Sequence, residues 1–414
     1  MRLTSIALLS CLVLAGCAGR PIGLMEPSAF AQAGASRVDL LAVTTRSDIG
    51  VPNGEMFGGA RGERMAYADI SISVPPDGAR QIGEVQWPAS LPANGQTEFA
   101  TISAEKLDSA SALARFHTRL AKAKHRRVLI FVHGFNTRFE EAVYRLAQIA
   151  HDSKAPALPV LFTWPSRGQL LAYTYDRESA NYSRDALEHL LQTLARDPAL
   201  GEITILAHSM GNWVTLEALR QMAIRNGAIH PKIKTVMLAS PDVDVDVFRR
   251  QIVEIGPKHP PFILFVSRDD RALALSQRIW GNNPRLGAID PNETGHHAML
   301  ENAAIQVVDL TDMKSNDRLN HGKFAQNPEI VQLIGGRLAA GQALSDSRSG
   351  LGEKIGLVTT GAASAVGRAA AIAVSAPLAI IDPETRRALP SQFDELGSDV
   401  ANAASNAGRV IPGY

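Results

Sequence analysis

The residues with the clearest chemical potential surround Ser209, in the sequence Ala-His-Ser-Met-Gly at residues 207–211. A short run of apolar and β-branched residues, 203–207, precedes this serine, and an apolar-periodic segment follows it. A nucleophilic serine commonly sits on a sharp strand-to-helix turn, where only small residues fit two positions before and two after it. Ala207 and Gly211 fill these positions, although glycine is usual at both. The pattern therefore predicts that Ser209 is a nucleophile.

A serine that attacks an acyl group needs two backbone N–H groups directed at the developing oxyanion. One comes from the residue after the serine, here Met210, and the other from the loop that follows an earlier strand. The apolar run 128–132 is followed by a candidate for that loop: His133, Gly134, Phe135 and Asn136. We predict that Phe135 supplies the second donor and that Gly134 lets the backbone turn into the site. His133 and Asn136 are expected to support this loop or to line a pocket. For His133, the alternatives are a general base and an ordinary histidine at the end of a strand.

The acid and the base of such a site follow the serine in the order Asp or Glu, then His, each after a later strand. Asp269 and Asp270 follow one late apolar run, and His321 follows the last one. We predict that His321 takes the proton from Ser209, while an aspartate fixes the tautomer of the histidine and stabilises its charged form.

Other residues compete for these two roles. We prefer Asp270 because it lies further beyond the strand, which leaves Asp269 for a loop hydrogen bond or the surface. Asp242, which follows another apolar run, is a second alternative acid. His296 and His297 are weaker candidates for the base, because they precede the last predicted strand instead of following it.

The elements that must position these residues alternate between strand and helix. Strands are predicted at 38–45, 65–74, 128–132, 158–162, 203–207, 233–239, 262–266 and 304–310. Helices are predicted at 107–124, at 178–195 and after Ser209. Another helix is predicted to begin near Thr137, because Thr137 and Glu140 can form a capping box. Residues 46–62, with five glycines, are predicted to be a loop. Continuous apolar strands that alternate with amphipathic helices indicate a mostly parallel, doubly wound sheet covered on both faces. Such a sheet binds ligands at the carboxyl ends of its strands, where the candidate residues lie.

Composition limits the classes of function. A chain of 414 residues with 45% apolar and 20% charged residues can form one large domain with appendages, or two domains. The formal net charge of +1 gives no electrostatic reason to expect nucleic-acid binding. There is no phosphate loop, dinucleotide fingerprint or convincing cluster of metal ligands, so we expect no cofactor and no metal.

Two terminal regions differ from the body of the chain. Arg2, an apolar run over 3–14 and Ala15-Gly16-Cys17 are typical of a secretory signal peptide. We expect a signal peptide at 1–16, a flexible tether rich in Ala, Gly, Pro and Ser at 17–36, a hydrolase domain at 37–340 and an extension at 341–414. Residues 352–381 of the extension are rich in Ala and Gly. Their small-residue spacing predicts packed helices or self-association, with a membrane span least favoured because Pro377 interrupts the run.

Residues 14–17, Leu-Ala-Gly-Cys, also resemble the lipobox of bacterial lipoproteins. The resemblance implies that Cys17 becomes the mature N-terminus and carries a lipid, which would anchor the protein in the cell envelope. An ordinary cleaved signal peptide is the alternative. Ala18 is not the aspartate typical of inner-membrane retention, which favours the outer membrane.

Four motifs together resemble bacterial α/β-hydrolases of formerly unknown function, a group similar to esterases and lipases. They lie at residues 131–137, 162–166, 207–212 and 267–276. The resemblance extends roughly over residues 38–335 and implies an α/β-hydrolase fold with Ser209, Asp270 and His321 as a catalytic triad. Trp164, in the second motif, would line the acyl pocket or fill the core. The resemblance implies no substrate.

The sequence therefore predicts a lipid-anchored cell-envelope serine hydrolase that cleaves small-molecule or lipid esters. An acyltransferase with the same triad is one alternative. A non-catalytic envelope lipoprotein that uses the scaffold for binding or assembly is the other.

Overall fold

The computed structural model describes residues 22–28, 34–50, 54–123, 125–315, 317–340 and 357–358. Its strands are β1 (Ser36–Asp48), β2 (Phe57–Val74), β3 (Ala100–Leu107), β4 (Arg127–Val132), β5 (Leu158–Thr163), β6 (Glu202–His208), β7 (Ile233–Ala239), β8 (Phe262–Val266), β9 (Gln306–Asp309) and β10 (Leu357–Val358). They form one sheet in the order β10-β9-β8-β7-β6-β4-β5-β1-β2-β3. β1 and β4 to β9 run parallel, whereas β2, β3 and β10 pair antiparallel at the edges.

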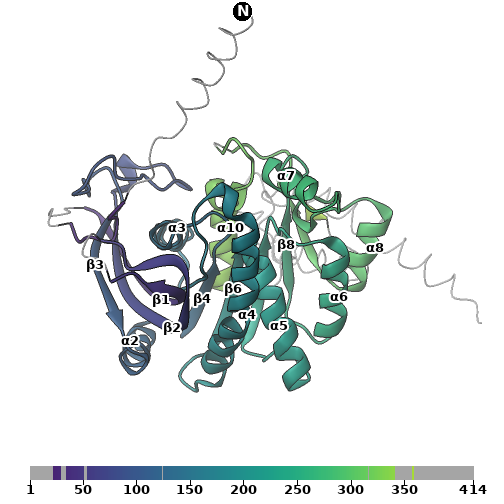
Figure 1. The fold of residues 1–414 in the computed structure, drawn as a ribbon, viewed down its shortest axis with the longest axis horizontal. Coiled ribbons are helices and arrows are strands. Elements are labelled where there is room, and N and C mark those ends of the chain that lie inside the picture. Colours follow the sequence, from purple (N-terminus) through teal and green to yellow (C-terminus); the bar gives the residue numbers. More distant parts are fainter. Residues whose placement is uncertain are drawn as a thin grey trace, which may run out of the picture.

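The helices cover both faces of this sheet (Figure 1). They are α2 (Ser109–Lys122), α3 (Phe139–Asp152), α4 (Tyr173–Arg196), α5 (Gly211–Asn226), α6 (Val245–Ile255), α7 (Arg271–Ile279), α8 (Thr294–Asn302), α9 (Lys323–Gln326) and α10 (Pro328–Ala340), with 3-10 turns η1 (Asp77–Ala79), η2 (Leu170–Ala172) and η3 (Leu286–Ala288). Side chains of α2, α4, α5, α6 and α8 join one apolar cluster with the sheet, and those of α3, α9 and α10 join another. Successive strand residues alternate between the two clusters, as Leu129 and Ile130 do in β4. The predicted doubly wound, mostly parallel sheet is therefore confirmed.

The strand order changes direction beside β4. β5 follows β4 in the chain and pairs with it on one side, whereas β6, the next strand, pairs with β4 on the other side. Connections that leave neighbouring strands in opposite directions open a crevice at the carboxyl ends of those strands. The loop after β4 and the turn after β6, which carry the predicted oxyanion donors and Ser209, meet at this position. No helix in the described part of the chain is long and apolar enough to cross a membrane.

The predicted loop over residues 46–62 is wrong at both ends, because β1 continues to Asp48 and β2 begins at Phe57. Two of its glycines serve close packing inside β2. A Cβ atom on Gly62 would lie 2.6 Å from the carbonyl oxygen of Arg46, and one on Gly59 would lie 2.8 Å from Cα of Arg167. Glycine in a strand often marks such a close approach of another backbone segment.

The capping box of α3 lies one residue later than predicted. The Glu141 carboxylate accepts a hydrogen bond from the N–H of Arg138 at 2.7 Å, so Arg138 occupies the position before the helix. The hydroxyl of Thr137 instead donates to the carbonyl oxygen of Phe135 at 3.1 Å. Thr137 therefore belongs to the loop after β4 and not to the helix.

Residues 22–28 pack against the domain, although they lie in the stretch 17–36 that is predicted to be a free tether. Leu24 and Met25 are buried, and the carbonyl oxygen of Leu24 accepts hydrogen bonds from Thr101 Oγ1 (2.6 Å) and Tyr144 OH (3.1 Å). This short segment is thus fixed to β3 and α3. The predicted signal peptide and Cys17 lie outside the described residues.

Most of the predicted extension 341–414 also lies outside the described residues. Leu357 and Val358, which fall in its Ala/Gly-rich part, form the edge strand β10 beside β9 instead of a helix.

Candidate active site

Ser209 occupies the turn between β6 and α5. Its φ angle is +52°, in the left-handed region that costs energy for a residue with a side chain and that often marks a functional turn. Its N–H donates to the carbonyl oxygen of Ala239 at 2.9 Å, while its own carbonyl oxygen accepts from Asp242 N at 3.2 Å and Asn212 Nδ2 at 3.0 Å. These neighbours hold the turn in its strained form.

The turn also packs tightly against the loop after β4. A Cβ atom on Gly211 would lie 2.4 Å from the carbonyl oxygen of His133, and one on Gly134 would lie 2.8 Å from Cβ of Ser209. Side chains at these two positions would push the neighbouring loops apart. The glycine requirement predicted for position 211 thus has a direct steric cause.

Gly211→Ala should destabilise the protein by about 1–3 kcal/mol or more, the usual cost of overpacking, because the new methyl group meets backbone that cannot move aside. Urea unfolding followed by circular dichroism measures the effect. The matched control is Gly336→Ala in α10, where an added Cβ atom meets nothing within 4 Å. Equal unfolding midpoints for Gly211→Ala and the wild type would contradict the close approach.

The predicted oxyanion donors lie on either side of this contact. Met210 directly precedes α5, and Phe135 follows Gly134 in the loop after β4. Within the described ranges, the backbone N–H groups of Met210 and Phe135 donate to no acceptor. Met210 also lies at the N-terminal end of α5, where the helix dipole favours negative charge. The arrangement suits a developing oxyanion next to Ser209.

His133 fixes the position of the loop. It accepts a hydrogen bond from the N–H of Trp164 at Nε2 (3.1 Å), and its Nδ1 lies 2.9 Å from the carbonyl oxygen of Gly134. The ring stacks on Trp164 with centroids 4.9 Å apart, and the indole N–H of Trp164 donates to the carbonyl oxygen of His133 at 2.9 Å. Burial and then the nearby charge of Arg46 lower the pKa of His133 to about 3. A neutral, fully bonded His133 supports the loop, and Trp164 is buried in the core.

Two buried charged residues that the sequence reasoning missed hold the same loop. Arg46 donates to the carbonyl oxygens of Thr137 (2.7 Å) and Ser166 (2.8 Å). Asp176 accepts from Ser166 Oγ at 2.5 Å and from the N–H of Asn136 at 3.3 Å. Together they tie β1 and α4 to the loop after β4. A single arginine in a strand and an aspartate in the first turn of a helix carry no local sequence signal for this role.

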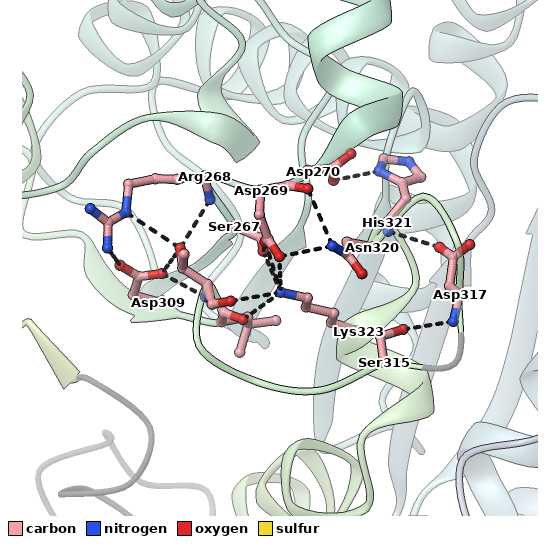
Figure 2. Close-up of polar contacts among 12 residues, drawn as sticks. Ser267, Arg268, Asp269, Asp270, Asp309, Ser315, Asp317, Asn320, His321 and Lys323 are labelled. Atoms are coloured by element: carbon pink, nitrogen blue, oxygen red, sulfur yellow. Dashed lines mark hydrogen bonds and ion pairs between the residues drawn. The ribbon is translucent and has the colours of Figure 1, made fainter.

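Asp270 and His321 point toward each other across two loops (Figure 2). His321 Nδ1 lies 2.7 Å from Asp270 Oδ2, and the other carboxylate oxygen accepts from the N–H of Leu273 at 2.9 Å, which caps α7. Asp317 accepts from the N–H groups of His321 (2.8 Å) and Gly322 (3.0 Å) and so fixes the histidine loop. Burial alone would lower the pKa of His321, but the charge of Asp270 and its hydrogen bond outweigh burial and raise this pKa.

His321 also lies beside the turn that carries Ser209. The rings of His321 and His208, the residue before Ser209, are 4.7 Å apart, and His208 Nε2 lies 3.2 Å from the carbonyl oxygen of His321. No hydrogen bond joins Ser209 Oγ to His321 among the residues that the structure describes. Contacts of this kind commonly tighten only when substrate binds. Burial lowers the pKa of His208, with a further contribution from His321.

Asp269 makes a different set of contacts. Both of its carboxylate oxygens bind Lys323 Nζ (2.8 and 3.0 Å), and one accepts from Asn320 Nδ2 at 2.8 Å. Figure 2 shows Lys323 directed at Asp269. Lys323 is buried and also donates to the carbonyl oxygens of Leu310 and Thr311, both at 2.9 Å. Asp269 and Lys323 thus join the acid loop to the histidine loop, and Lys323 is a third buried charged residue that could not be predicted from the sequence.

Asp242 is close to Ser209 through its backbone, but its carboxylate is engaged elsewhere. It accepts from Tyr173 OH and Ser276 Oγ, both at 2.6 Å, and its Oδ1 lies 3.5 Å from Arg285 Nε. Of the three candidate aspartates, only Asp270 contacts His321.

His296 and His297 lie on α8, where they contact Glu293 and Glu301 and not the turn of Ser209. In the part of the chain that the structure describes, no three His, Cys, Asp or Glu residues are arranged to bind a metal ion.

The chain is similar to several known proteins. It is 27% identical over 141 residues to the uncharacterized protein alr1448 of Nostoc sp., a match that covers 28% of this chain and 36% of that protein. The chain thus spans about a third of the length of this curated relative. A lipase-esterase related protein of Clostridium acetobutylicum has 13% identity and a TM-score of 0.28, covering 52% of this chain and 95% of that one. A fungal esterase of Rhizomucor miehei has 12% identity and a TM-score of 0.30, covering 81% and 90%.

A family model matches residues 108–337, more than half of the chain, which include the loop after β4, the turn of Ser209, Asp270 and His321. The family is described as an alpha/beta hydrolase of unknown function (DUF900). The observed strand order and the carboxyl-end position of the site agree with that description. The chain therefore belongs to the DUF900 family of alpha/beta hydrolases of unknown function.

Proposed function

We propose that this protein is a serine hydrolase that cleaves carboxylic esters through an acyl-enzyme. Ser209 is the nucleophile, His321 the base and Asp270 the acid, with Met210 and Phe135 as oxyanion donors. The observation that carries this proposal is the Asp270–His321 contact of 2.7 Å beside a serine held at a φ of +52°. Few structural roles require a buried carboxylate to orient a histidine next to a strained serine.

The geometry supports an ordered sequence of proton transfers. His321 Nε2 removes the proton from Ser209 Oγ as Oγ bonds to the carbonyl carbon, and Asp270 stabilises the imidazolium that forms. The N–H groups of Met210 and Phe135 bind the oxyanion of the tetrahedral intermediate. The C–O bond to the alcohol then breaks, and His321 returns its proton to the leaving alcohol. Water repeats the sequence on the acyl-enzyme and releases the acid.

We further propose that the enzyme acts in the cell envelope, anchored by a lipid on Cys17, with the outer membrane favoured. The resemblance of residues 14–17 to a lipobox supports this location. Small-molecule or lipid esters are the proposed substrates, and transfer of the acyl group to an alcohol or amine is distinguished by product analysis.

Labelling with a fluorophosphonate tests the proposed nucleophile, because this probe bonds irreversibly to an activated serine. The folded protein should gain one adduct, which mass spectrometry of the digested protein should locate on Ser209. Heat-unfolded protein should remain unlabelled. A folded sample in which Ser209 is never modified would exclude the serine-hydrolase mechanism.

The pH profile tests the base. His321 must be neutral to accept the proton, so kcat/KM should rise with pH through its pKa. Because Asp270 raises this pKa, the midpoint should lie above the ordinary histidine value of about 6.5. In Asp270→Asn the residual activity should show a lower midpoint, since the raising charge is gone. A midpoint that does not respond to this change would argue against the pair.

A further inference from the structure

We propose that Arg177 forms an anion-binding subsite beside the catalytic serine, which selects ester substrates that carry a carboxylate or phosphate group. The inference rests on the proposed esterase function and deepens it by naming the substrate class.

Arg177 lies on α4, one turn after Tyr173, and its guanidinium packs on two tryptophans. Its central carbon lies 4.2 Å from the ring centroid of Trp213 and 5.0 Å from that of Trp280. These cation–π contacts orient the flat guanidinium without using its five N–H donors. Arg177 forms no hydrogen bond or ion pair within the described segments of the chain. By contrast, Arg184 on the same helix lies 3.4 Å from the carboxylate of Asp185.

A second unused donor adjoins Arg177. The indole Nε1 of Trp280 is buried and has no hydrogen-bond partner, whereas Trp213 Nε1 donates to Asn181 Oδ1 at 2.6 Å. A buried N–H group without an acceptor is costly and rare in folded proteins, and it calls for a specific explanation. The two observations are independent and indicate the same kind of ligand.

The subsite lies next to the proposed oxyanion donors. The ring of Tyr173 is 5.0 Å from that of Phe135 and 5.7 Å from that of Trp280. On the other side, the N–H of Trp213 donates to the carbonyl oxygen of Met210 at 3.0 Å. Arg177 is therefore linked to both proposed oxyanion donors. Trp213 connects it directly to Met210, and Trp280 connects it through Tyr173 to Phe135.

The chemistry of the guanidinium favours an oxyanion. Its planar fork matches the paired oxygens of carboxylate and phosphate groups, and its charge persists at all physiological pH values. A hydrogen bond to a charged group contributes enough to change binding about 10- to 100-fold. A substrate with an anionic group at a fixed distance from its ester would gain this factor over a neutral analogue.

A pair of substrates tests whether the Arg177 subsite selects esters that carry a carboxylate. Mono-4-nitrophenyl adipate and 4-nitrophenyl hexanoate share the leaving group and the six-carbon acyl chain and differ in the terminal carboxylate. The wild type should prefer the adipate at least tenfold in kcat/KM. Arg177→Met should lose this preference but hydrolyse the hexanoate within about threefold of wild type, and Arg177→Lys should retain part of it. Arg184→Met, which removes the same charge from the same helix, should keep the preference intact.

Tryptophan fluorescence tests whether the Arg177 subsite binds phosphate, and this measurement does not rely on turnover. Because Arg177 contacts the rings of both Trp213 and Trp280, titration with inorganic phosphate at constant ionic strength should produce a saturable change in emission. Arg177→Met should abolish the change, and Arg184→Met should preserve it. A response to phosphate supports a phosphate-bearing substrate, and an adipate preference without that response supports a carboxylate.

The proposal is overturned if the wild type shows neither effect, or if Arg177→Met reduces the turnover of both esters equally, which would indicate a structural clamp. Failure of the proposed function is distinguishable, since neither ester would then be hydrolysed and Ser209 would resist the fluorophosphonate. The phosphate titration would still report on Arg177.

Discussion

Ser209→Ala should lower kcat for 4-nitrophenyl hexanoate by about 10⁴- to 10⁶-fold, the range seen when a triad serine is removed. The alanine has no oxygen that can bond to the acyl carbon, so no acyl-enzyme can form. Residual turnover would come only from binding and the oxyanion donors. Steady-state hydrolysis by the purified variant, with mass spectrometry to exclude the acyl-enzyme, measures this loss.

Ser240→Ala is the matched control for that variant. Ser240 directly follows the neighbouring strand β7, is also buried and has a φ of +43°. Its replacement removes the same oxygen under similar backbone strain, but it should leave kcat within a few-fold of wild type. If both variants lost activity equally, strain at the strand ends and not the Ser209 hydroxyl would account for the result.

Asp270→Asn should reduce kcat by about 10⁴-fold, the effect of the same change in a serine-protease triad. An asparagine keeps an oxygen for the N–H of Leu273, so the cap of α7 survives. Its amide would face His321 Nδ1 with N–H donors instead of an acceptor and would favour the wrong tautomer of the ring. The fold should therefore remain intact while the base is disabled, and circular dichroism together with kcat distinguishes the two.

The corresponding changes at the other two aspartates decide the assignment of the acid. Asp242→Asn should reduce kcat far less, because the Asp242 carboxylate contacts Tyr173, Ser276 and Arg285 and not His321. Asp269→Asn should mainly lower the midpoint of unfolding, since it weakens the contact with Lys323. A larger catalytic loss in Asp242→Asn than in Asp270→Asn would refute the choice of Asp270.

Much of the fold could be predicted from the sequence because its central strands are buried on both faces. The runs predicted at 233–239 and 262–266 coincide with β7 and β8. Residues 262–266 are apolar throughout, and 233–239 end in four consecutive apolar residues. The first part of β2 could not be predicted in this way. Its glycines resemble a loop unless one knows that the backbones of Arg46 and Arg167 pack against them.

The site shows the same limit. The motif around Ser209 and the order of the later residues were sufficient to nominate Asp270 and His321. One local feature separates Asp270 from Asp269. Asp270 directly precedes α7, where aspartate is a favoured helix cap, so its carboxylate is held at the start of that helix. The supports of the oxyanion loop, Arg46 and Asp176, are separated from it along the chain by scores of residues. Only the folded chain brings them together.

The buried segment at Leu24 and Met25 has a further consequence if Cys17 carries a lipid. Only five residue steps separate Cys17 from Ile22, where the described chain begins, and fully extended they would reach about 18 Å. The radius of gyration of a domain of some 300 residues is of similar size, about 19 Å. The domain would therefore be held close to the bilayer, with the parts of β3 and α3 that contact Leu24 on the side of the lipid surface. A lipid anchor at this distance would limit hydrolysis to esters that lie close to one bilayer.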